Sequence, residues 1–156
     1  MNKILLAMLS GLLISGSAYA DDEHEIVESN TLKFLGAPKI TEEASAEYLK
    51  NSGFRTEEDS FAKDATIIHN RLTVADGEGQ PFLFAFNEGN RIVGVASSYD
   101  SSNSAFFESL AKLDGVTCIK QKSRFFSLAT CHHTSAKPET VKKFQRNFKI
   151  LMENAG

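Results

Sequence analysis

The spacing of apolar residues changes along the chain, and that spacing indicates which segments are helices and which are strands. After residue 41, apolar positions recur at helical spacing. Thr41 suits an N-cap and Gly53 stands where glycine often ends a helix, so the pattern predicts a helix from about Thr41 to Ser52. Farther along, apolar and polar residues alternate, which predicts a strand from about Ile67 to Val74.

The clearest strand pair is a hairpin from Phe82 to Ala96. Three phenylalanines alternate with smaller apolar residues before a turn at residues 87–90, and a second apolar run returns after the turn. Pro81 fits only the first residue of such a strand, because proline cannot donate a hydrogen bond within a central ladder.

In the last third of the chain the pattern predicts a helix, two strands and a second helix. Apolar spacing predicts a helix from Ser104 to Leu113, followed by strands from Val116 to Lys120 and from Arg124 to Cys131. A final helix from Pro138 to Met152 carries an apolar stripe. The stripe residues are Val141, Phe144, Phe148 and Leu151.

These elements follow the order α-β-β-β-α-β-β-α. Hairpins without βαβ alternation favour an α+β fold, so we expect an antiparallel sheet of about five strands with three helices. Residues 31–156 have the size of a single domain.

The first 20 residues have the composition of a secretory signal peptide. Lys3 precedes an apolar run from Ile4 to Ile14, and Ala18-Tyr19-Ala20 follows as a small-residue cleavage site. The run is shorter than the about 20 apolar residues that span a bilayer, and no later stretch is long and apolar enough. We therefore expect cleavage after Ala20 and an exported chain, periplasmic or secreted, whose mature form has no membrane span.

Charge is unevenly distributed along the mature chain. From Asp21 to Leu113 there are 8 basic and 17 acidic residues (net −9), and from Asp114 to Gly156 there are 8 basic and 3 acidic residues (net +5). Because residues 21–30 are acidic and poor in aromatic residues, we expect a flexible N-terminal segment there. The two halves can complement each other within one fold, which we prefer, or steer a charged partner. The overall acidity disfavours nucleic acid as that partner.

Cys118 and Cys131 are expected to form a disulfide, because an exported protein meets an oxidising compartment. A tight turn at residues 121–122 conflicts with this bond. It would place the cysteines roughly 20 Å apart at about 3.3 Å per residue, whereas a disulfide needs Cα atoms within about 7 Å. Either the strand bends or bulges before Cys131, or the register shifts so that residues 123–126 form the loop tip.

The shifted register would expose two phenylalanines beside basic residues and so create a contact surface. The alternative, which we prefer, places one phenylalanine on each face of the sheet. The candidate binding residues around this hairpin are Lys120, Lys122, Arg124, Phe125 and Phe126.

No segment carries a catalytic signature, so we predict no enzyme activity, no catalytic residue and no cofactor. The alternative function is metal or thiol chemistry, for which the candidate residues are Cys118, Cys131, His132 and His133. The close-spaced cysteine pair of zinc sites is missing, and adjacent histidines on an extended segment point to opposite faces. We therefore predict no metal site.

The order of elements from Thr41 to Asn154 resembles that of YbjN-type domains, whose fold is similar to that of type III secretion chaperones. The segments that carry the resemblance are Thr41–Phe54, Phe82–Ala96, Ser104–Leu113 and Pro138–Met152. They cover most of the mature chain but contain no diagnostic residues, and the cysteine pair departs from the pattern. The resemblance implies protein or peptide binding and supplies no functional residues.

These observations converge on one functional class. They predict an exported periplasmic protein-binding module without enzyme activity, either of the immunity or inhibitor type or chaperone-like. Its expected partner is another envelope or secreted protein, which would bind to a sheet face or a sheet edge.

Overall fold

The structure is a computed structural model that describes residues 24–56, 69–73 and 81–155. The predicted signal peptide, residues 1–20, lies outside these ranges and stays a prediction. Ile67, Ile68 and Val74 of the predicted strand also lie outside them.

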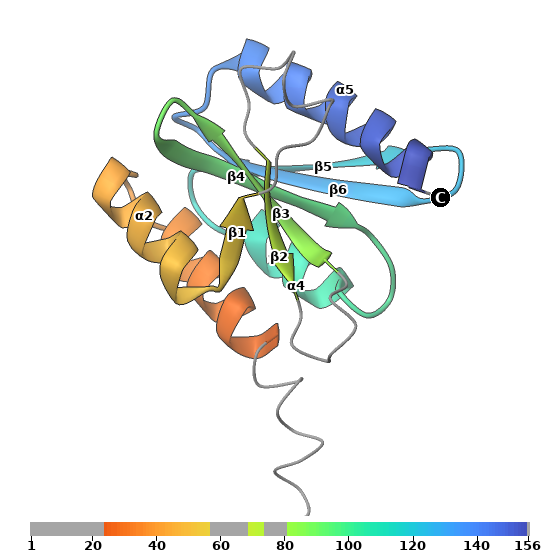
Figure 1. Cartoon of the computed structure of the whole chain (residues 1–156). Coiled ribbons are helices and arrows are strands. Elements are labelled where there is room, and N and C mark those ends of the chain that lie inside the picture. Colours follow the sequence, from red (N-terminus) through yellow and green to blue (C-terminus); the bar gives the residue numbers. More distant parts are fainter. Residues whose placement is uncertain (1–23, 57–68, 74–80, 156) are drawn as a thin grey trace, which may run out of the picture.

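The described residues form an α+β fold with an antiparallel sheet, as predicted (Figure 1). The helices span residues 24–35, α2 (Glu42–Asn51), α4 (Ser104–Ala111) and α5 (Pro138–Ala155). The strands are β1 (Phe54–Thr56), β2 (His69–Thr73), β3 (Pro81–Glu88), β4 (Arg91–Ser98), β5 (Val116–Lys122) and β6 (Ser127–His133).

Within the described residues the sheet has six strands in the order β1-β2-β3-β4-β6-β5, where about five were expected. The additional strand is β1, which pairs with β2 through three residues. So short a strand shows no alternation in the sequence, which is why the pattern did not reveal it.

The helix predicted from Thr41 to Ser52 forms as α2. The Thr41 hydroxyl accepts a hydrogen bond from the Ala44 N–H at 3.1 Å, and Gly53 follows the helix with a positive φ of 68°. An N-cap hydroxyl and a left-handed glycine are the signals that the sequence offered, and both act as expected.

The N-terminal segment 21–30 was expected to be flexible, and its residues from 24 onward belong to a helix that was not predicted. Residues 24–35 form a helix, so the described residues contain four helices rather than three. Its buried residues are Val27, Thr31, Phe34 and Leu35. Acidic residues such as Glu25 lie on the exposed side of this helix. They give the segment an acidic composition, which obscures the helical spacing of its apolar residues.

Helices cover both faces of the sheet. One core joins helix 24–35, α2 and α4 to one face, and the second joins α5 to the other. The apolar stripe predicted for α5 is buried there, and the Phe144 ring stacks on Phe86 at 4.0 Å between centroids. The hairpin of β3 and β4 lies between these two layers, so both strands are apolar on both faces.

A register shift in this central hairpin changes the alternation of β4, so that Ile92 and Val95 face one core while Val93 and Ala96 face the other. Between Phe86 and Asn87 the pairing passes from Gly94 to Ile92, so Val93 is the additional residue of a β-bulge. Gly94 is required beside it, because a Cβ there would lie 2.2 Å from the Phe86 ring.

The second hairpin resolves the register conflict around the cysteines. Cys118 lies directly opposite Cys131, and the two form the expected disulfide with an S–S distance of 2.03 Å. Residues 123–126 therefore form the loop. Our preference for Phe125 and Phe126 on opposite faces of the sheet is wrong, because the disulfide fixes the shifted register and leaves both residues in the loop.

Candidate protein-binding surface

The hairpin tip, residues 123–126, joins β5 to β6 and is held by local hydrogen bonds. The Ser123 N–H donates to the Phe126 carbonyl at 2.8 Å, and the Phe126 N–H donates to the Ser123 hydroxyl at 3.1 Å. The Arg124 N–H also donates to the Glu153 carboxylate on α5 at 3.2 Å. The tip therefore has a defined shape although it projects from the sheet.

The two phenylalanines of the tip are exposed. Phe125 is 56% exposed and Phe126 is 39% exposed, and the rings meet edge to face with their centroids 6.4 Å apart. The Arg124 guanidinium lies 5.1 Å from the centre of the Phe125 ring. Exposed aromatic rings beside a guanidinium are the residue types that contribute most to protein interfaces.

The basic residues of β5 extend this surface along the strand. Lys120 places its ammonium group 4.3 Å from the centre of the Tyr99 ring. A side-chain hydrogen bond with Tyr99 raises the pKa of Lys120 above its ordinary value, so this lysine stays charged. Lys122 is exposed and pairs with Ser127 next to the tip. The structure thus brings the five candidate residues together on one hairpin, although Lys120 faces Tyr99 and not the tip.

The basic half of the sequence is gathered in the same part of the fold. Residues from Asp114 onward, which carry a net charge of +5, form β5, β6 and α5, drawn in blue shades and lying together in Figure 1. The tip therefore belongs to the basic part of the fold.

The cysteines and histidines proposed for metal or thiol chemistry do not converge. The two cysteines are bonded to each other, and no described cysteine is free. His132 and His133 follow one another on β6 and so face opposite sides of the sheet. Within the described ranges, no group of three or more histidine, cysteine or acidic residues is arranged to hold a metal ion.

His133 has a structural role. The Ser135 N–H donates to His133 Nδ1 at 3.1 Å, so the proton is on Nε2, which donates to the Ala37 carbonyl at 3.0 Å. This buried ring ties the end of β6 to the segment that follows helix 24–35. His132 is half-buried, and burial lowers the pKa of its imidazole below the ordinary value.

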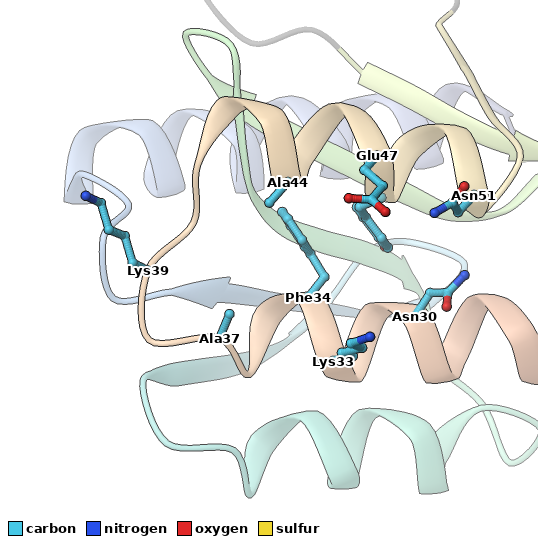
Figure 2. Close-up of a pocket in the computed structure, with 9 residues that line it drawn as sticks. Asn30, Lys33, Phe34, Ala37, Lys39, Ala44, Glu47 and Asn51 are labelled. Atoms are coloured by element: carbon cyan, nitrogen blue, oxygen red, sulfur yellow. The ribbon is translucent and has the colours of Figure 1, made fainter.

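A concave region that was not predicted from the sequence lies between helix 24–35 and α2 (Figure 2). Its volume is about 260 Å³, and its floor contains the stacked rings of Phe34 and Tyr48, 4.4 Å apart. Lys33 and Glu47 lie at its rim, and both are exposed.

The Tyr48 hydroxyl has a hydrogen-bond partner within the protein. It is hydrogen-bonded to the Thr31 hydroxyl at 2.7 Å, and burial raises its pKa. The helical spacing of Val27, Thr31 and Phe34 was the signal that could have revealed helix 24–35, which forms one wall of this groove.

Comparison with known proteins gives no match: no family model, no curated protein and no solved structure matches the chain. Among the described residues, no helix is both long and apolar enough to cross a membrane.

Proposed function

We propose that this chain is an exported protein-binding module without enzyme activity, and that its hairpin tip contacts an acidic surface of another envelope or secreted protein. Both an immunity or inhibitor protein and a chaperone-like peptide binder fit this description. The resemblance to YbjN-type domains, which rests on element order alone, agrees with the same class and stays a prediction.

One observation carries the proposal: two adjacent phenylalanines are exposed on a tip whose backbone is fixed. Apolar rings cost free energy in water, and this cost is recovered when a partner covers them. Because hydrogen bonds between Ser123 and Phe126 and from Arg124 to Glu153 already hold the tip, binding would require little additional ordering of the loop. Lys122 and Arg124 flank the rings and would select an acidic partner.

The test is capture of a partner by the tagged mature chain, Asp21 to Gly156, from an envelope extract of its own source. The informative variant carries Phe125→Ser and Phe126→Ser. A matched control carries Ile26→Ser, which removes another exposed apolar side chain (53% exposed) from the distant helix 24–35.

We expect one dominant partner with the wild type and the control, and none with the tip variant or at high salt. With the purified partner, the tip variant should bind at least about tenfold more weakly. Equal capture by the tip variant, or no partner in an extract where an unrelated bait succeeds, would contradict the proposal.

The alternative function, metal or thiol chemistry with Cys118, Cys131, His132 and His133, requires a free thiol or converging ligands. The two cysteines are bonded to each other, which does not favour a free thiol. The two histidines face opposite sides of the sheet, which does not favour converging ligands. A thiol count on the purified, denatured protein without reductant tests this alternative directly, and a count of zero would exclude the thiol branch.

A further inference from the structure

The strand β5 stands at one edge of the sheet. In the part of the chain that the structure describes, it pairs with β6 and with no other strand. It is seven residues long, and most of its side chains are exposed. An edge strand of this length presents a row of backbone donors and acceptors that an extended segment can use.

The position of the disulfide shows which backbone groups of β5 face outward. The Cα atoms of Cys118 and Cys131 are 4.1 Å apart, the short spacing of a non-hydrogen-bonded antiparallel pair. Such pairs alternate with hydrogen-bonded ones, so the neighbouring residues Thr117, Ile119 and Gln121 exchange hydrogen bonds with β6. The residues that direct N–H and C=O away from β6 are Cys118, Lys120 and Lys122.

The two faces of the same edge differ in chemistry. Cys118 packs against the core under α4, so Lys120 and Lys122 share that face by the two-residue period of a strand. On the opposite face, toward α5, Ile119 is 41% exposed. The edge thus offers positive charge on one side and an apolar contact on the other.

Resting on the proposed function, we propose that the partner supplies an extended acidic segment that adds to β5 as a seventh strand. Its acidic side chains lie beside Lys120 and Lys122, and its alternate apolar side chains lie beside Ile119. A second copy of β5 is a poorer occupant, because antiparallel self-pairing would bring the lysines of both chains close together.

The experiment measures binding of a blocked eight-residue peptide that alternates valine and glutamate, labelled for fluorescence anisotropy, to the intact mature chain. We expect saturable binding to the wild type. The matching valine–lysine peptide should bind at least about tenfold more weakly. No binding of the valine–glutamate peptide to folded wild-type protein overturns the proposal.

The backbone contribution is isolated by comparing Lys120→Pro with Lys120→Ala. Both variants remove the charge, but only proline removes the outward N–H, and it does so without breaking a bond to β6. We expect Lys120→Pro to bind at least about tenfold more weakly than Lys120→Ala. Equal binding by two folded variants would overturn strand addition.

A second measurement leaves the protein unchanged, in case Lys120→Pro does not fold. Two peptides are N-methylated, one on every valine and the other on every glutamate. Because only alternate N–H groups of an added strand face β5, one peptide should lose binding and the other should retain it. Equal binding by both would overturn the proposal.

The same variants separate this inference from the proposed function. If the captured envelope partner is lost with Phe125→Ser and Phe126→Ser but retained with Lys120→Pro, the binding tip stands and strand addition is wrong. If the partner is retained with all of these variants, the tip itself is the wrong surface.

Discussion

The two hairpins of this protein share a motif and differ in almost every other respect. The β3–β4 hairpin is central, with β2 and β6 beside it and helices on both faces. The β5–β6 hairpin reaches the edge, and β5 has mostly exposed side chains. The comparison shows that the place of a hairpin in the sheet, more than the motif, decides whether its aromatic residues hold the fold or stay available for contact.

The interactions that stabilise the two hairpins also differ. The central hairpin relies on packing, with Phe86 between Gly94 and Phe144. The edge hairpin has less apolar contact and is held by a disulfide and by polar bonds at its tip. Substitutions that remove packing should therefore destabilise the central hairpin, and substitutions that remove the disulfide should loosen mainly the edge hairpin.

The largest difference is expected when one phenylalanine is replaced by alanine in each hairpin separately. Phe86→Ala should lower the free energy of unfolding by about 3–5 kcal/mol, because a fully buried ring leaves a cavity. Phe125→Ala should change it by less than about 0.5 kcal/mol, because its ring is exposed. Urea unfolding measures both, and similar losses would show that the tip is part of the core.

The disulfide should rank next. Cys118→Ala with Cys131→Ala should lower the free energy of unfolding by about 3 kcal/mol, since the bond joins residues 13 positions apart in the sequence and closes a short loop. Amide hydrogen exchange should rise first at the hairpin tip and in β5, while β3 and β4 stay protected. Uniform loss of protection would mean that the two hairpins unfold as one unit.

Gly94→Ala should lower the free energy of unfolding by about 2–3 kcal/mol, because the new methyl group meets the Phe86 ring and the Cys131 carbonyl. Gly89→Ala in the turn of the same hairpin is the control. A Cβ there meets nothing within 4 Å, and only its positive φ of 63° is strained, which costs about 1 kcal/mol. A Gly89 effect larger than that of Gly94 would contradict the packing described for Phe86.

The smallest effect concerns pH and His132. Burial lowers its pKa in the folded state, so the unfolded chain binds the proton more readily. The stabilising contribution is present above the ordinary histidine pKa of about 6.5 and is lost as pH falls through the folded value. The melting temperature should therefore drop less for His132→Gln than for the wild type between pH 7.5 and 5. Equal drops would mean that His132 does not contribute.

Much of the fold could be predicted because local signals and burial agree. Thr41, Gly53 and the stripe of α5 act as their positions in the sequence indicate. Helix 24–35 was missed because acidic residues dominate the composition of segment 21–30, where the helix begins, although Val27 and Phe34 follow helical spacing. The tip was misplaced for a different reason: a long-range bond fixes the register of the hairpin, and periodicity alone carries no register.

The strand order also constrains how the protein can acquire its structure. β6 lies between β4 and β5, and α5, which covers the Phe84 and Phe86 side of the sheet, follows β6 in the chain. A nascent chain delivered N-terminus first therefore exposes the edge of β4 and the phenylalanines of that face until β6 and α5 arrive. This domain can finish folding only after both elements are present, and a product that stops before residue 127 would be prone to aggregate through that open edge.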